Sequence, residues 1–162
     1  MVDSVLIVDD DVNARIIAET LLEAHGLRVR TAADGTQACE IARREDTEVV
    51  VVDLTSPGTN GLDVIRQLRA RFEFPRLPTQ PRIIALTDTT QPEVERFARR
   101  LGAEVCLQKP TVSTHLIAAV EQLLAARGSP GEASGRHLRA SSPGVPGPIL
   151  RINTTTDLAR TT

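Results

Sequence analysis

The sequence has no long apolar run. No stretch approaches the roughly 18 residues that a membrane-spanning helix needs, and the apolar opening at 5–8 is far shorter than the core of a signal peptide. The formal net charge is only −2, so the composition gives no reason to expect binding to nucleic acid or to a membrane surface. We therefore expect a cytoplasmic protein.

Cysteine and histidine are scarce and scattered. Cys39 and Cys106 do not have the spacing of metal ligands, and in a reducing compartment we expect them to be small buried hydrophobic residues. The three histidines form no visible cluster: His25, His115 and His137. The sequence therefore gives no sign of a metal site built from these residue types.

Lysine is almost absent. Lys109 is the only lysine among 19 basic residues, and all the others are arginine. A general drift toward arginine explains the majority, but not why one position keeps a compact, flexible ammonium group instead of a planar guanidinium. Lys109 is therefore a candidate functional residue.

The composition changes near residue 128. The chain has 162 residues, 41% of them hydrophobic, which suits one domain with a core and a tail. Residues 128–162 contain four prolines and five glycines but no aromatic residue, so they cannot bury enough apolar surface to offset the entropy of ordering. We expect a folded domain at 1–127 and a disordered C-terminal tail at 128–162.

Apolar strands alternate strictly with amphipathic helices in the first part. The run of valines at 49–52 leads into Asp53 and is typical of a strand buried on both faces of a parallel sheet. The predicted strands are 4–8, 27–31, 49–53, 82–86 and 104–107. The predicted helices are 12–24 (with Ile17, Leu21 and Ala24), 35–44, 62–71, 92–100 (with Val94, Phe97 and Ala98) and 112–127, and a proline-rich connection spans 72–81. This alternation predicts an α/β fold, a doubly wound five-stranded parallel sheet with helices on both faces.

Polar residues follow four of these strands. Asp9 and Asp10 end the first strand, Asp53 the third and Thr87 the fourth, and Lys109 lies just past the fifth. In the strand order 2-1-3-4-5 the first and third strands flank the point where ligands bind in such sheets. We expect an acidic pocket with a hydroxyl and an ammonium group on its rim.

The three consecutive acids at 9–11 allow two interpretations. In one, Asp11 caps the following helix and the others are solvated. In the other, the carboxylates form a site for a hard cation such as Mg2+, which prefers oxygen ligands and keeps several waters.

Four motifs together resemble the receiver domain of response regulators, in particular the stand-alone chemotaxis regulators. They are VLIVDDD at the start, DLTSPGTNG around Asp53, IALTD with Thr87, and GAEVCLQKP with Lys109. The resemblance covers about residues 4–127. It implies the flavodoxin-like fold with strand order 2-1-3-4-5, and a role in two-component signalling.

The resemblance implies specific roles for the residues at the strand ends. Asp53 would accept a phosphoryl group from the phosphohistidine of a histidine kinase or phosphotransfer protein. Thr87 would hydrogen-bond the phosphoryl group, Lys109 would pair with it, and Pro110 would follow a cis peptide bond. Mg2+ would be held by Asp9, Asp10, Asp53 and the backbone carbonyl of Thr55, with Asp10 a more direct ligand than Asp9.

Three positions depart from the family pattern. Ser56 stands where methionine is common, and we expect this change to be harmless. Cys106 stands where the family often has a tyrosine or phenylalanine that moves inward on activation, and the chain has no tyrosine or tryptophan to replace it. Asp88 stands where a small residue usually follows the switch threonine, and it either faces the phosphoryl site as an extra carboxylate or points to solvent or caps the next helix.

The leading hypothesis is a phosphorylation-switched module that signals through protein contacts at 92–100, 104–107 and 112–127, to a downstream protein that the sequence does not name. It would be no enzyme apart from its own Mg2+-dependent phosphotransfer and autodephosphorylation. A second hypothesis is a non-phosphorylated adaptor that uses the same surface constitutively. A third, a Mg2+-dependent phosphatase, would need a second acid two residues after Asp53, where Thr55 stands.

Overall fold

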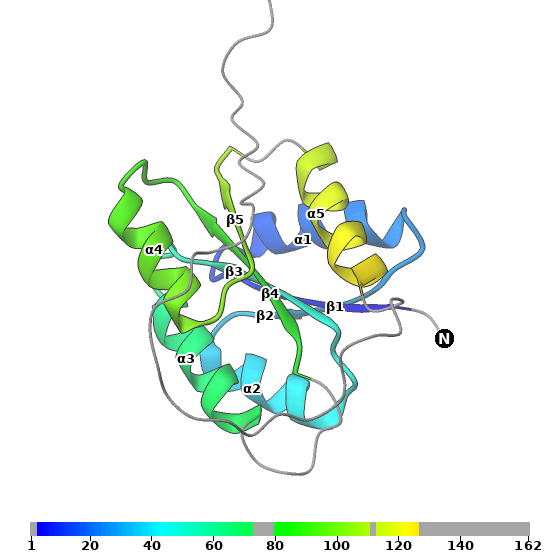
Figure 1. Ribbon diagram of the computed structural model, residues 1–162. Coiled ribbons are helices and arrows are strands. Elements are labelled where there is room, and N and C mark those ends of the chain that lie inside the picture. Colours follow the sequence, from blue (N-terminus) through cyan, green and yellow to red (C-terminus); the bar gives the residue numbers. More distant parts are fainter. Residues whose placement is uncertain (1–2, 73–79, 111–112, 127–162) are drawn as a thin grey trace, which may run out of the picture. The chain divides into compact units, whose positions relative to one another are not determined.

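The protein forms a five-stranded parallel sheet in the order β2-β1-β3-β4-β5, as predicted (Figure 1). The structure is a computed structural model that describes residues 3–72, 80–110 and 113–126. The predicted disordered tail at 128–162 lies outside the described residues, as does most of the proline-rich connection. In the described part of the chain, no helix is long and apolar enough to span a membrane.

Each strand is followed by a helix, and the bounds match the sequence prediction to within one or two residues. The strands are β1 (Ser4–Val8), β2 (Arg28–Ala32), β3 (Val49–Asp53), β4 (Arg82–Thr87) and β5 (Val105–Gln108). The helices are α1 (Val12–Glu23), α2 (Gly35–Arg44), α3 (Gly61–Phe72), α4 (Pro92–Leu101) and α5 (Ser113–Ala125).

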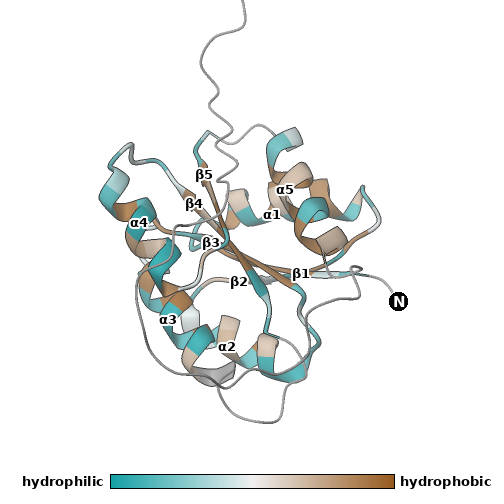
Figure 2. Cartoon of the chain, in the orientation of Figure 1, coloured by the Kyte–Doolittle hydropathy of each residue, from teal (hydrophilic) through white to brown (hydrophobic). Residues whose placement is uncertain are grey.

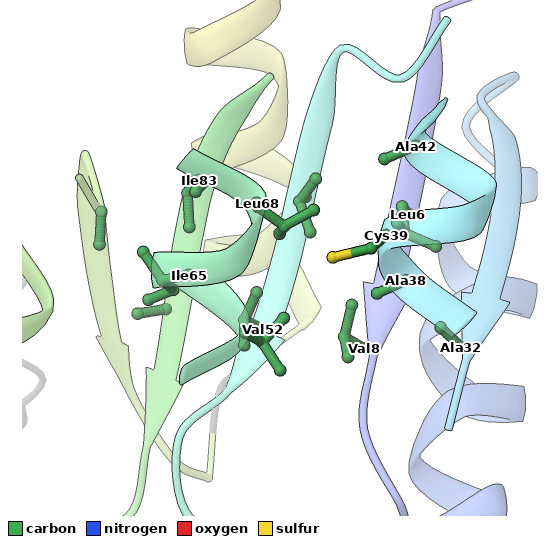
Figure 3. Close-up of a cluster of buried hydrophobic side chains, with 14 of the residues drawn as sticks. Leu6, Val8, Ala32, Ala38, Cys39, Ala42, Val52, Ile65, Leu68 and Ile83 are labelled. Carbon is green, nitrogen blue, oxygen red and sulfur yellow. The ribbon is translucent and has the colours of Figure 1, made fainter. Parts of the chain in front are cut away.

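The sheet has a hydrophobic cluster on each face. One contains buried residues of α2, α3 and α4, and the other contains buried residues of α1 and α5. The ribbon shows the same two layers (Figure 1), and the inner strands β1, β3 and β4 between them are mostly hydrophobic (Figure 2). In the first cluster, Ala38 and Ala42 of α2 lie near Leu6 of β1 (Figure 3).

Strand β3 is the middle strand of the sheet, and helices cover both of its faces. Val50 and Val52 belong to the cluster under α2, α3 and α4, whereas Val49 and Val51 belong to the cluster under α1 and α5. Successive side chains of a strand point to opposite faces, so a strand covered on both sides needs an apolar residue at every position. The valine run therefore fixes Asp53 at the end of a fully buried strand.

Three apolar residues that helical spacing predicts to face the sheet are exposed: Ile17, Phe97 and Ala24, which is the C-cap of α1. Ile17 of α1 is 67% exposed, and the residues of α1 that face the sheet are Ala18, Leu21 and Leu22. Phe97 of α4 is 49% exposed, whereas the next residue, Ala98, is buried as predicted. The apolar stripe on each helix is wider than the surface that the sheet offers, so its margin stays in solvent.

Candidate functional site

Strand register brings the predicted site residues to one edge of the sheet. Val8 of β1 lies opposite Val52 of β3, so Asp9 follows beside Asp53. Thr87 ends β4, and the Lys109 amide donates to its carbonyl oxygen at 2.7 Å. The Lys109–Pro110 peptide bond is cis, as the resemblance implied.

Asp53 is buried and carries a direct ion pair. Its side chain is 4% exposed, and its Oδ2 lies 2.6 Å from the Lys109 ammonium nitrogen. Burial alone would raise the pKa of Asp53, but hydrogen bonds from Lys109, Thr55 and Ser56 outweigh it and lower the pKa below its ordinary value. The carboxylate is therefore held ionised although it is shielded from water.

Asp9 is the second buried carboxylate at this edge. Burial raises its pKa above the ordinary value, and the neighbouring Asp53 adds to the shift, while the hydrogen bond from the Asp11 amide opposes it. Its Oδ2 lies 3.9 Å from the Lys109 nitrogen, much farther than the Asp53 oxygen. Lys109 thus neutralises Asp53 better than Asp9, and the pair keeps an excess of negative charge.

Two hydroxyl groups contact the carboxylates, and neither contact was predicted from the sequence. Thr55 donates to Asp53 Oδ1 from its amide at 3.0 Å and from its hydroxyl at 2.9 Å. Ser56 Oγ lies 2.7 Å from Asp53 Oδ2 and 3.1 Å from Asp9 Oδ1. Ser56, expected to be harmless, therefore lies inside the site; serine in place of a common methionine was the available signal.

The other two acids of the triplet have different partners. Asp11 caps α1 by accepting from the amide of Asn13 at 2.8 Å, so the capping interpretation is correct for this residue. Asp10 Oδ2 accepts from the Gly58 amide across the loop after β3. A Cβ at Gly58 would collide with that carboxylate, so a larger residue here would require the Asp10 side chain to move.

The donor set suits a magnesium ion chemically, but it is not assembled around one point. Asp9, Asp10 and Asp53 offer carboxylate oxygens, and the two buried carboxylates share the single ammonium group of Lys109, which favours a hard cation. Within the described ranges, however, no three acidic, histidine or cysteine side chains are close enough together to hold an ion as they stand. Asp10, whose Oδ2 accepts from the Gly58 amide, would have to come closer to the other two carboxylates to complete such a group.

Thr87 and Asp88 lie at the end of β4. The Thr87 side chain is buried, and its hydroxyl oxygen accepts from the Thr89 amide at 3.2 Å. Asp88 is exposed, and α4 begins after Gln91, so Asp88 is not its N-cap. The helix-cap interpretation of Asp88 is therefore wrong, and its exposure supports the solvent-facing one.

Cys106 occupies the position of the family's aromatic switch residue on β5. It is partly buried and packs against the cluster under α2, α3 and α4. Burial raises the pKa of its thiol to about 11. A small neutral thiol that already packs inward cannot reproduce the movement of a large ring from surface to interior.

The chain belongs to the response regulator receiver domain family. The family model matches residues 5–121, which include all the strand-end residues described above. The receiver-domain resemblance and its fold are thus confirmed, and the protein is a receiver domain of the two-component type.

Two curated relatives illustrate the range of this family. The chain is 32% identical to protein PilH of Pseudomonas aeruginosa over 121 residues, which cover 75% of this chain and 97% of PilH. It is 33% identical to the sensory/regulatory protein RpfC of Xanthomonas campestris over 118 residues, 73% of this chain. The chain spans only 16% of the length of RpfC.

Solved receiver structures have the same fold. The chemotaxis protein CheY4 of Vibrio cholerae superposes with a TM-score of 0.68 at 27% identity, covering 76% of this chain and 99% of CheY4. The receiver domain of Francisella response regulator 1452 also gives 0.68, at 24% identity, with 77% and 98% of the two chains covered.

The ion pair predicts how the charge of Asp53 depends on Lys109. Lys109→Met should raise the pKa of Asp53, because burial then acts against fewer hydrogen bonds. Carboxyl carbon shifts measured by NMR against pH, without magnesium, would show the change. The control is Arg82→Met, which breaks the Arg82–Glu104 ion pair at the start of β4 and should leave the pKa of Asp53 unaltered.

The lowered pKa of Asp53 makes the stability of the fold depend on pH. Because the pKa of Asp53 is lower in the folded than in the unfolded state, its hydrogen bonds stabilise the fold above the unfolded pKa, and this stabilisation is lost as pH falls through the folded pKa. Lys109→Met should reduce that dependence. An Asp53 pKa that does not move would mean that Lys109 does not hold the carboxylate ionised.

Proposed function

We propose that the protein is a phosphorylation-switched receiver module in which Asp53 accepts a phosphoryl group from a histidine kinase or a phosphotransfer protein. The observation that carries this proposal is the buried Asp53 carboxylate, held ionised by Lys109 at 2.6 Å at the carboxyl end of the central strand. A nucleophile must be ionised to attack phosphorus, and its partner cation then remains to neutralise the incoming oxygens.

The transfer forms one bond to phosphorus and breaks another. An oxygen of Asp53 forms a bond to phosphorus, the bond between phosphorus and the donor's histidine nitrogen breaks, and its electron pair leaves with the imidazole. Lys109 pairs with the phosphoryl oxygens, and the Thr87 hydroxyl turns from the Thr89 amide to donate to one of them. The product is an acyl phosphate that carries about −1.5 to −2 charges, in place of the single negative charge of the free carboxylate.

Magnesium belongs to this proposal as a cofactor. Asp9, Asp10, Asp53 and the Thr55 backbone carbonyl would hold Mg2+. The bound ion would supply positive charge that offsets the repulsion between carboxylates and phosphoryl oxygens. The geometry supports this role, because one ammonium group serves two buried carboxylates and lies 2.6 Å from Asp53 but 3.9 Å from Asp9.

A protein donor has to dock next to the acidic edge, and α1 offers an apolar surface there. Val12, Ile16 and Ile17 are each more than half exposed, and Val12 directly follows the acid triplet. Exposed apolar side chains grouped on one helix indicate a protein contact surface. We assign this surface to the phosphodonor protein because its histidine must reach Asp53 while it is bound.

The output surface in this proposal is formed by α4, β5 and α5. Exposed Phe97 on α4 gives this surface an apolar contact point, and Cys106 is the partly buried residue of β5 that packs against the cluster under α2, α3 and α4. Because a thiol replaces the aromatic switch residue, the phosphorylation signal must reach this face through the loop after Thr87.

The second candidate function is a constitutive adaptor that uses the same face without phosphorylation. Cys106 favours it, because a small thiol is less suited than an aromatic ring to act as a switch. In the leading proposal the module has no substrate besides its phosphodonor.

Removing the acceptor carboxylate tests the function directly. The wild-type protein incubated with phosphoramidate and Mg2+ should gain one phosphoryl group that hydroxylamine releases, because an acyl phosphate is labile to that nucleophile. Asp53→Asn should gain none, measured by intact mass. Asp63→Asn, which alters an exposed acid paired with Arg66 on α3, is the matched control and should be phosphorylated like the wild type. Hydroxylamine-sensitive phosphate on Asp53→Asn would reject the assignment, and an inert wild type would favour the adaptor.

If α1 is the docking surface, a substitution there should slow phosphorylation by a protein donor but not by a small-molecule donor. Ile17→Glu should slow phosphorylation by a histidine-phosphorylated phosphotransfer protein about tenfold, because it places a charge in an apolar contact. Its rate with acetyl phosphate should stay at the wild-type value, since a small donor needs no docking. Phe97→Glu, an exposed apolar residue on α4, should leave both rates unchanged. Equal slowing with both donors would mean that Ile17 affects the site and not docking.

A further inference from the structure

Ser56 is placed between the two buried carboxylates of the site. It lies in the loop between β3 and α3, is 9% exposed, and contacts Asp53 Oδ2 at 2.7 Å and Asp9 Oδ1 at 3.1 Å. A hydroxyl group carries one hydrogen, so it can donate to only one of these oxygens at a time. The shorter contact assigns that hydrogen to Asp53.

With that hydrogen bond, Asp53 has no oxygen lone pair left free. An ionised carboxylate has about four acceptor positions. Four donors fill them: the Thr55 amide and hydroxyl on Oδ1, and Ser56 and Lys109 on Oδ2. Phosphorus or a metal ion can therefore bond to Asp53 only after a donor withdraws.

Among these donors, the Ser56 hydroxyl is the one that can withdraw with the least rearrangement. The Thr55 amide is fixed by the backbone, and the Thr55 hydroxyl donates to Asp53 Oδ1 alone in the described part of the chain. Withdrawal of Lys109 would leave a buried carboxylate without its ion pair. Ser56 already has a second acceptor within reach, Asp9 Oδ1. Rotation of its hydrogen about the Cβ–Oγ bond changes acceptors without moving a heavy atom.

We propose that Ser56 is a positioning residue whose hydroxyl caps Asp53 in the resting protein and turns to Asp9 when Asp53 takes a phosphoryl group. This rests on the proposed function. Whichever way the hydrogen points, it occupies one of the carboxylates that would bind Mg2+, so Ser56 lowers both the metal affinity and the reactivity of Asp53. In phosphorylation by acetyl phosphate, the Asp53 oxygen bonds to phosphorus as acetate leaves with the electron pair of the broken P–O bond. The Ser56 hydrogen stays on its oxygen throughout.

The test compares Ser56→Ala with Ser56→Thr. Ser56→Ala should lower the Mg2+ dissociation constant, measured from amide shifts without a phosphodonor, by about three- to tenfold, the range expected for one net hydrogen bond. Its initial rate with acetyl phosphate at saturating Mg2+ should rise by a similar factor. Ser56→Thr keeps the hydroxyl and should restore both values.

Thr59→Val is the matched control. Thr59 is a buried residue of the same loop, but its hydroxyl donates to the Ala33 carbonyl at 2.9 Å instead of a carboxylate. The variant should lose some thermal stability and keep the wild-type Mg2+ affinity and rate. A melting curve for each variant shows that it is folded.

Several results would overturn the proposal. These are unchanged or weaker Mg2+ binding by Ser56→Ala, a Ser56→Thr protein that behaves like Ser56→Ala, or an equal gain in Thr59→Val. If neither the wild type nor any variant is phosphorylated, the proposed function fails. The Mg2+ titration would still decide the role of Ser56.

Discussion

The contact between Asp53 and Lys109 is the interaction on which the rest of the site depends. Two carboxylates, Asp53 and Asp9, are buried side by side at the end of a hydrophobic sheet, where ionised groups are strongly disfavoured without a partner. Lys109 lies close to one and farther from the other. This asymmetry divides the roles: an ionised carboxylate suited to attack, and a second one whose unmet charge favours a cation.

The fold positions this pair through backbone register and close packing. Parallel pairing of β1 with β3 places Asp9 next to Asp53, and the hydrogen bond from the Lys109 amide to Thr87 fixes the end of β5. Gly61, the first residue of α3, lies so close to the end of β3 that a Cβ would collide with the Asp53 carbonyl oxygen. The loop containing Thr55 and Ser56 is therefore held tightly between strand and helix.

Most of the fold could be predicted because it depends on patterns that the sequence displays directly. The valine run, the alternation of strands with helices and the glycines after α1 and α4 follow from periodicity and backbone preference, and Gly26 and Gly102 have positive φ angles of 79° and 117°. The strand ends also identified which residues meet at one edge. The exposure of Ile17 and Phe97 was not predictable, because spacing gives a helix face but not how much of it the sheet covers.

The details of the site depended on side-chain directions that no pattern encodes. Asp10 turns to the Gly58 amide, and Ser56 turns into the carboxylate pair; the position of a residue at a strand end or in a loop does not fix where its side chain points. The four donors around Asp53 are brought together by side-chain and loop conformations that residue spacing does not specify. The family pattern did mark position 56 as unusual, which shows where such departures should be checked.

The most direct test of the account is an NMR titration with beryllofluoride, a phosphoryl mimic, in the presence of Mg2+. If Asp53 and Lys109 form a working phosphoacceptor site, the amide signals of Asp53, Thr87 and Lys109 should shift saturably, and smaller shifts should follow in α4 and β5. The same addition to Asp53→Asn should produce none of these changes. Saturating beryllofluoride that leaves the wild-type signals of Asp53, Thr87 and Lys109 in place would contradict the account, because a buried, ionised carboxylate paired with an ammonium group would then not bind a phosphoryl mimic.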